Sequence, residues 1–288
     1  MTVSRPLLAW RFATGYHRGI HKRHVAVTAS RSAIREPSEP VRVLQVTDPH
    51  LFADVDGSLR GTKTYASLAS VLAHIVDAGW PADLVVMTGD LIQDDTREAY
   101  DRLIELMEPL GLPVYCIPGN HDVRELMREA LSRRPFHYCD SVVIGNWLIT
   151  GIDSCVDGDA GGRVSAAELD RLEALLGDTD AEHVMVCLHH PPLPVGSKWL
   201  DAVGLHNGAD FADLIARAGN VRVAIFGHVH QDFDQEYDSV RIIGTPSTCR
   251  QFEPLVDEFA LDDNPPGYRR ITLYADGSLD SELIWVAP

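Results

Sequence analysis

Residues 41–47 read VRVLQVT and are followed directly by Asp48-Pro49-His50. The run of apolar and β-branched residues predicts a buried β-strand. The polar residues begin where this strand ends. Ligands of α/β sheets bind at the carboxyl ends of the strands. The junction therefore predicts both a strand in an α/β fold and one part of a functional site.

Four more apolar runs end in polar clusters. Residues 83–88 lead into Gly89-Asp90, residues 114–118 into Gly119-Asn120-His121-Asp122, residues 183–188 into His189-His190-Pro191, and residues 221–226 into Gly227-His228-Val229-His230. Six of the ten histidines after residue 40 lie in the five clusters. We expect the five strand ends to converge on one cleft.

Helical patterns alternate with these strands. Helices are predicted over residues 65–78, 96–108, 123–133, 166–176 and 209–218, the fourth opened by a capping box at Ser165-Ala-Ala-Glu168. Further strands are predicted at 141–144 and 147–152, which form a hairpin, and at 240–243, 268–274 and 279–286. Residues 257–267 are expected to be a long surface loop. The pattern indicates an α/β domain with at least one mixed sheet.

The charge divides the chain into two parts. The 288 residues include 42 Asp and Glu against 25 Lys and Arg, a net charge of −17. Residues 1–40 hold seven Lys and Arg against two Glu, a net +5, which leaves −22 on the other 248 residues. We expect residues 1–40 to be a basic, disordered extension and residues 41–288 to be the folded domain; a targeting peptide is the alternative for the extension. The acidic body argues against a nucleic-acid polymer as partner.

Other features suggest a compartment. No apolar run approaches the roughly 18 residues that a membrane span needs, so no membrane partner is expected. The five cysteines are odd in number and include no C-x-x-C motif. Because nothing here requires an oxidising environment, we expect free thiols and a cytoplasmic protein.

The polar clusters share one kind of chemistry. They supply carboxylates, imidazoles and one carboxamide, which are ligands of divalent and trivalent metals, and the lack of ligating thiols disfavours structural zinc. If the backbone stays extended, Asp48 and His50 share one face, as do His228 and His230. Glycine before Asp90, Asn120 and His228 allows close backbone approach. Each cluster alone is weak evidence, but five in this order predict a metal centre.

The order D-x-H, G-D, G-N-H-D, H-H-P and G-H-x-H resembles the calcineurin-like metallophosphoesterase superfamily from about Val41 to the C-terminus. Within it, the chain is most similar to the bacterial class III 3′,5′-cyclic AMP phosphodiesterases. That closer similarity is carried by Ser197-Lys-Trp-Leu-Asp201, by Thr245-Pro-Ser-Thr-Cys-Arg-Gln-Phe252 and by Pro266-Gly-Tyr-Arg269. The resemblance implies an αββα sandwich of two mixed sheets flanked by helices.

The resemblance also implies a centre of two metal ions that share one carboxylate. The first ion would be bound by Asp48, His50, Asp90 and His230, and the second by Asp90, Asn120, His189 and His228. His190 is expected beside the ligands rather than among them. Iron and manganese are the ions that the resemblance implies, and the donor types also admit zinc or cobalt.

The implied reaction is hydrolysis of 3′,5′-cyclic AMP to 5′-AMP, with His121 as the residue that protonates the leaving oxygen. The residues implied to contact the substrate are His50, Asp90, Asn120, His121 and His230. Asp122 either orients His121 or caps the next helix. His206 and Asn207 either reach the base or ribose or belong to a surface loop.

Three alternatives stay open. Two of them are enzymes of the same superfamily, a glycerophosphodiesterase and a broad phosphodiesterase. The third is a metal-free binding scaffold with the same fold. A protein phosphatase is disfavoured because residues 89–95, GDLIQDD, lack the arginine of the G-D-x-x-D-R-G pattern. A homodimer is compatible with all of these readings.

Overall fold

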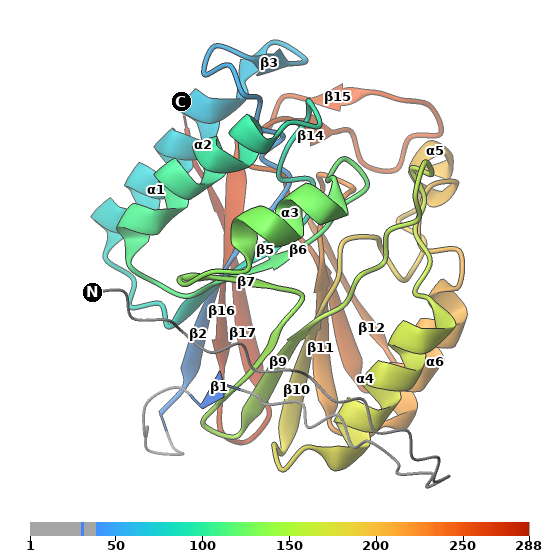
Figure 1. Cartoon of the computed structure of the whole chain (residues 1–288). Coiled ribbons are helices and arrows are strands. Elements are labelled where there is room, and N and C mark those ends of the chain that lie inside the picture. Colours follow the sequence, from blue (N-terminus) through green and yellow to red (C-terminus); the bar gives the residue numbers. More distant parts are fainter. Residues whose placement is uncertain (1–29, 32–38, 288) are drawn as a thin grey trace, which may run out of the picture.

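The computed structural model describes residues 30–31 and 39–287, which form two β-sheets packed face to face with helices on both outer sides (Figure 1). The predicted αββα sandwich is confirmed. The six-stranded sheet has the order β17 (Leu279–Trp285), β16 (Gly267–Leu273), β2 (Val41–Val46), β5 (Leu84–Thr88), β6 (Val114–Ile117) and β7 (Phe136–Tyr138). The seven-stranded sheet has the order β1 (Ser30–Arg31), β8 (Ser141–Ile144), β9 (Trp147–Gly151), β10 (His183–Cys187), β11 (Val221–Phe226), β13 (Val240–Gly244) and β12 (Phe233–Tyr237).

Both sheets are mixed, and within each sheet the central strands run parallel to one another. β2 pairs in parallel with β5, and β5 with β6, while β16 runs antiparallel to β2. β10 likewise pairs in parallel with β9 and β11. Because parallel strands in one sheet end at the same edge, the polar residues after β2, β5 and β6 are brought together, as are those after β10 and β11.

Alternate residues of each central strand face different layers. Val41 and Val43 of β2 pack between the two sheets, whereas Leu44 and Val46 pack under the helices. The strand is therefore buried on both faces, which explains why its sequence is a nearly continuous apolar run.

The helices divide between the two outer faces. α1 (Thr64–Ala78), α2 (Arg97–Met107) and α3 (Arg124–Leu131) contribute buried residues to the cluster on the six-stranded sheet, and α4 (Ala166–Asp178) and α6 (Gly208–Arg217) to the cluster on the seven-stranded sheet. A 3₁₀ turn (Glu108–Leu110) follows α2. Half of the predicted capping box is confirmed, since the Ser165 hydroxyl accepts a hydrogen bond from the Glu168 N–H at 3.2 Å. The Glu168 carboxylate accepts hydrogen bonds from the Asp153 N–H and from Arg171.

Several short elements have no clear signal in the sequence. They are β3 (Ser58–Leu59), β4 (Thr62–Lys63), α5 (Lys198–Asp201), β14 (Gln251–Phe252) and β15 (Leu261–Asp262), besides β7 and β12. The expected loop at 257–267 is wrong in part, because Leu261–Asp262 pairs antiparallel with Gln251–Phe252. Two-residue strands are too short to show the period of two on which such predictions depend.

The expected N-terminal extension falls almost entirely outside the described residues. Ser30–Arg31 alone are described within its first 38 residues, and they pair in parallel with Val142 and Val143 of β8. Among the described residues, no helix combines the length and the apolarity that crossing a bilayer requires.

Candidate functional site

The five polar clusters meet at one edge of the sandwich. Main-chain hydrogen bonds join their turns: Asp48 N–H donates to the Gly89 carbonyl at 3.1 Å, His50 N–H to the Asp90 carbonyl at 3.0 Å and Gly227 N–H to the His189 carbonyl at 3.1 Å. The predicted convergence of the strand ends is therefore observed. The structure brings together all the residues predicted as metal ligands, which are Asp48, His50, Asp90, Asn120, His189, His228 and His230.

One half of the site contains Asp48, His50, Asp90 and His230. The Nε2 atoms of His50 and His230 lie 3.2 Å apart. His50 Nε2 is 3.7 Å from Asp90 Oδ2, and His230 Nε2 is 3.4 Å from Asp48 Oδ1. Donors bound to one first-row cation at about 2.0–2.2 Å stand about 3–3.6 Å from one another, so this group has the spacing of a metal site.

The other half contains Asp90, Asn120, His189 and His228. His189 Nε2 lies 3.4 Å from Asp90 Oδ1, 3.2 Å from Asn120 Oδ1 and 3.2 Å from His228 Nδ1. His228 Nδ1 is 3.0 Å from Asn120 Oδ1. The two oxygens of Asp90 thus face different halves of the site.

Backbone carbonyls fix which imidazole nitrogens face inward. His189 Nδ1 lies 2.7 Å from the Thr88 carbonyl, and His230 Nδ1 lies 2.5 Å from the Arg250 carbonyl. Because a carbonyl oxygen can only accept, each Nδ1 donates, and the Nε2 of the neutral ring directs a lone pair into the site. A ligating histidine is usually held in this way, so the residues present fit a pair of bound cations.

The backbone at five of the predicted ligands is left-handed. Asp48, His50, Asp90, His228 and His230 have φ values of 51°, 48°, 50°, 68° and 52°. The extended backbone on which the shared face of D-x-H and H-x-H was conditional is therefore not present. A non-glycine residue in this conformation costs about 1–2 kcal/mol, and such strain concentrates at functional sites. It persists here because main-chain hydrogen bonds hold the turns across the sheet edge.

Two glycines are required by close approach. A Cβ on Gly119 would lie 2.2 Å from Asp90 Oδ1, and one on Gly227 would lie 2.6 Å from Asp48 Oδ2. The role predicted for the glycines before Asn120 and His228 follows directly from these contacts.

Burial and the clustered charges act in opposite directions on the site. Burial would raise the pKa of Asp90, but the neighbouring imidazoles, His189 first, hold it well below its ordinary value. Burial would lower the pKa of His189, yet the Asp90 carboxylate outweighs it and raises the pKa to about 9. Burial and the positive charge of His189 lower the pKa of His228 to about 3. A proton on His189 and a cation therefore compete for one lone pair.

His121 lies at the edge of the cluster. The backbone N–H of His121 donates to Asp90 Oδ1 at 2.9 Å. The centroid of its ring is 5.0 Å from the ring centroid of His50. Its Nδ1 lies 3.2 Å from the side-chain amide nitrogen of Gln93. With the amide nitrogen as donor, the neutral ring carries its proton on Nε2.

Asp122 has a structural role that neither prediction described. The N-cap residue of α3 is Val123, so the N-cap interpretation of Asp122 is wrong. The Asp122 carboxylate accepts hydrogen bonds from the Leu91 N–H, the Gly119 N–H and the Tyr100 hydroxyl. Loss of hydration and the nearby Asp90 charge raise the pKa of Asp122 to about 7. Asp122 thereby ties the loop after β6 to the loop after β5.

His190 is buried, with both ring nitrogens engaged. Its Nδ1 lies 2.8 Å from Ser154 Oγ, and its Nε2 donates to the Ala160 carbonyl at 3.3 Å. This agrees with its predicted place beside the ligands.

The oxygen and the nitrogen of the Asn207 side-chain amide are both hydrogen-bonded. The amide exchanges two hydrogen bonds with the backbone of Val164, at 3.1 and 2.9 Å. His206 is exposed, and its Nε2 lies 3.4 Å from Asp159 Oδ2. These contacts favour the surface-loop interpretation for His206 only. For Asn207 that interpretation is wrong, because its side chain is buried at the start of α6.

Three supporting residues were missed by the sequence analysis: Thr88, Gln93 and Ser154. A fourth, Arg250, was named only as part of the motif at residues 245–252, without a role. Thr88 and Arg250 act through their carbonyls, which every residue type carries, so nothing in their side chains could reveal them. Gln93 could have been found by its position, three residues after Asp90 in the same turn.

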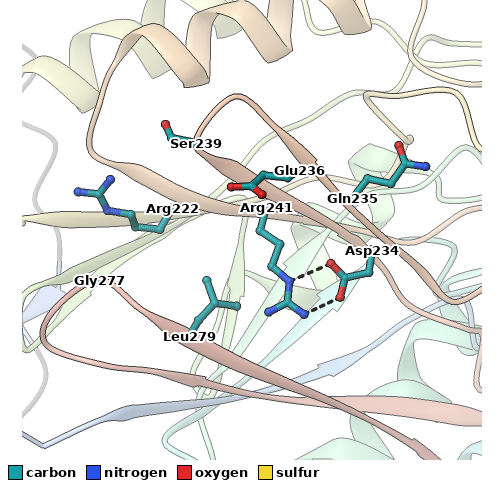
Figure 2. Close-up of a pocket in the computed structure, with 8 residues that line it drawn as sticks. All are labelled: Arg222, Asp234, Gln235, Glu236, Ser239, Arg241, Gly277 and Leu279. Atoms are coloured by element: carbon teal, nitrogen blue, oxygen red, sulfur yellow. Dashed lines mark hydrogen bonds and ion pairs between the residues drawn. The ribbon is translucent and has the colours of Figure 1, made fainter.

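A surface cavity of about 460 Å³ lies elsewhere and contains none of the predicted site residues (Figure 2). It opens beside the first residues of β11 and β13 and the turn between β16 and β17, at the opposite ends of the strands. Arg241 in this cavity is paired with Asp234. Its mixed charges give no chemistry comparable with the cluster of imidazoles and carboxylates.

Known proteins are similar to this chain in sequence, in fold or in both. Curated relatives include the 3′,5′-cyclic adenosine monophosphate phosphodiesterase CpdA of Haemophilus influenzae, 39% identical over 84% of this chain and 89% of the relative. A 3′,5′-cyclic-nucleotide phosphodiesterase of Nostoc is 35% identical over 85% of this chain and 92% of the relative. A dimetal phosphatase from Danio rerio shares the fold, with a TM-score of 0.61 at 15% identity over 86% of this chain and all of that one.

The model of the calcineurin-like phosphoesterase family matches residues 41–232, which include every residue of the cluster. This family uses a dinuclear metal site, in agreement with the two groups of donors on either side of Asp90. The chain belongs to the calcineurin-like phosphoesterase family and is a hydrolase of phosphoric esters.

Proposed function

We propose that the protein hydrolyses 3′,5′-cyclic AMP to 5′-AMP and so lowers a cyclic-nucleotide signal. The substrate rests on the curated relatives, which are named as cyclic-nucleotide phosphodiesterases and match at 35–39% identity over about five sixths of the chain. The observation that carries the chemistry is the division of the donors into two groups that share Asp90.

The proposed ligands are the residues of these two groups. Asp48, His50, Asp90 and His230 would bind one ion, and Asp90, Asn120, His189 and His228 the other, with iron or manganese as the proposed ions. When bound, the two ions supply Lewis acidity and an activated water. They also reverse the local charge, which allows an acidic protein to bind an anionic diester.

His121 is the proposed general acid. Hydrolysis forms a bond from a water oxygen to phosphorus and breaks the P–O3′ bond, so the departing O3′ alkoxide needs a proton. The protonated His121 ring would donate it from Nε2, the nitrogen opposite the contact with Gln93, and become a neutral imidazole. The remaining proton would stay on Nδ1, where the Gln93 amide can accept it through its oxygen. The proposed substrate contacts are His50, Asp90, Asn120, His121 and His230, which surround the same small volume.

The catalytic unit is proposed to be residues 41–288. The five cysteines all lie in the described residues and none forms a disulfide, which supports a reducing compartment such as the cytoplasm. The proposed substrate is a free cyclic nucleotide. The proposed oligomeric state is a homodimer, which size-exclusion chromatography can test.

The decisive experiment compares three substrate classes with purified, metal-reconstituted protein. We expect kcat/KM to be highest for 3′,5′-cyclic AMP, lower for 2′,3′-cyclic AMP and lowest for glycerophosphodiesters. A clear preference for glycerophosphodiesters would replace the proposed substrate and keep the reaction class. As a control, Asp90→Ala and Asn120→Ala should each abolish metal-dependent hydrolysis of bis(p-nitrophenyl) phosphate. Retained activity in both variants would show that the ligand assignment is wrong and that this cluster is not the catalytic site.

A further inference from the structure

Several motifs that resemble the phosphodiesterases contain no proposed ligand, yet they lie beside the cluster. Residues 197–201 include α5, and residues 245–252 end in β14, which pairs with β15. In Figure 1, α5 and the β14–β15 hairpin both stand at the upper edge of the sandwich, together with the loops that follow the central strands. These segments therefore border the site on one side.

Aromatic rings extend outward from one of the proposed ligands. The ring of Phe252 stacks on His230 with centroids 4.3 Å apart and planes inclined by 13°. Trp199 follows at 5.1 Å from Phe252, and Phe259 lies 5.3 Å from Trp199 and 5.6 Å from Phe252. We call Trp199, Phe252 and Phe259 the aromatic wall. Its first residue, Phe252, is in direct contact with the proposed ligand His230.

The outer part of the wall is open to solvent. Phe259 is 45% exposed, and its neighbours on the hairpin, Leu255 and Leu261, are 76% and 36% exposed. Among the described residues six large apolar side chains are exposed, and half of them lie on this one hairpin. The guanidinium carbon of Arg60 lies 4.7 Å from the Phe259 ring centroid. An apolar patch next to a site and rimmed by charge is a typical ligand-binding surface.

We propose that the aromatic wall binds the purine base of the cyclic nucleotide, an inference that rests on the proposed function. In a 3′,5′-cyclic nucleotide the phosphate closes a ring on one side of the ribose, and the base projects from C1′ on the other. A phosphate at the metal donors therefore leaves the base about one sugar away. The wall occupies the border of the site beside His230, and aromatic side chains stack on nucleobases regardless of their edges.

Phe259 is the residue to vary, because it is exposed and does not touch a proposed ligand. Phe259→Leu keeps an apolar side chain and removes the ring. We expect it to raise KM for 3′,5′-cyclic AMP by about tenfold and to change kcat less than twofold. Phe259→Tyr keeps a ring and should retain the wild-type KM. Tyr274→Leu, in the turn region at the other end of the sheets, serves as the control for loss of an aromatic residue.

The comparison substrate is a ribose 3′,5′-cyclic phosphate with hydrogen in place of the base. Its kcat/KM should be the same in the wild type and in Phe259→Leu, which also shows that the variant is folded. If Phe259→Leu impairs both substrates equally, or changes neither KM, the wall only packs the hairpin against α5 and the inference is wrong. A variant that changes oligomeric size and not KM would show instead a contact between copies of the chain.

The two proposals fail in distinguishable ways. If the wild-type protein does not hydrolyse 3′,5′-cyclic AMP, both fall together. If it does, and Phe259→Leu shows no selective loss for the substrate that carries a base, only the role of the wall is overturned.

Discussion

His189 donates a hydrogen bond of 2.7 Å from Nδ1 to the carbonyl oxygen of Thr88, and its Nε2 stands 3.4 Å from Asp90. The backbone of β5 thus orients a residue that lies about 100 positions later in the chain. His190, the next residue, has both nitrogens occupied by Ser154 and Ala160. The two adjacent histidines therefore differ in the ring nitrogen that remains available: Nε2 of His189 faces Asp90, whereas both ring nitrogens of His190 are engaged.

The first prediction separates these two histidines. His189→Gln should reduce the bound metal from two ions per chain to one, because it removes an inward-facing lone pair. His190→Gln should retain both ions, since His190 contributes hydrogen bonds rather than a free donor. The measurement is metal content by mass spectrometry after reconstitution and gel filtration. Loss of metal in a folded His190→Gln variant would contradict the assignment.

A second prediction concerns His121 and the basicity of the leaving group. His121→Ala should lower kcat for 3′,5′-cyclic AMP by about 10²–10⁴-fold, the usual contribution of a general acid. It should affect bis(p-nitrophenyl) phosphate much less, because nitrophenolate departs without a proton. Steady-state kinetics on the two substrates gives the comparison. Equal losses on both would assign His121 to binding instead.

Gln93 is expected to act as a positioning residue for His121. Its amide nitrogen lies 3.2 Å from His121 Nδ1. Gln93→Leu should lower kcat for 3′,5′-cyclic AMP by about tenfold, leave KM nearly unchanged and spare bis(p-nitrophenyl) phosphate, because the ring loses its preferred orientation and tautomer. Gln235→Leu on β12, remote from the site, is the matched control. A change confined to KM would argue against a positioning role.

Gly119→Ala should weaken metal binding. The new methyl group would lie 2.2 Å from both Asp90 N and Asp90 Oδ1, so the shared carboxylate must move. Titration with Mn²⁺ should show loss of high-affinity binding at one or both positions. Gly177→Ala in α4 is the control: nothing lies within 4 Å of its Cβ position, and alanine favours a helix by about 1 kcal/mol. Equal metal affinity in the two variants would contradict the prediction.

Asn207→Ala should affect stability rather than catalysis. It removes two hydrogen bonds and leaves the backbone N–H and carbonyl of Val164 without these partners. We expect the free energy of unfolding in urea to fall by about 2–4 kcal/mol. Asn264→Ala, an exposed position, should change it by less than about 0.5 kcal/mol. A selective loss of cyclic AMP binding with unchanged stability would instead support contact with the ribose or base.

The fold was largely predictable, and the reason is visible in particular elements. β2, β5, β6, β10 and β11 are buried on both faces and appear as apolar runs. Their carboxyl ends carry the polar residues, so topology alone brings these residues to one edge. By contrast, β12 has the burial pattern of an exposed edge strand, and β14 and β15 have two residues each, so neither shows a usable period.

The sequence by itself determined the donor types and their order, because metal ligands are side chains of a few kinds and strand ends are local features. Only the tertiary structure decided how those donors are held. The left-handed backbone at Asp48 and His230, the carbonyls of Thr88 and Arg250, and the stacking of Phe252 on His230 all depend on contacts between segments distant in the chain. Such contacts are set by main-chain geometry and packing across the sandwich, and a local pattern of residue types does not encode them.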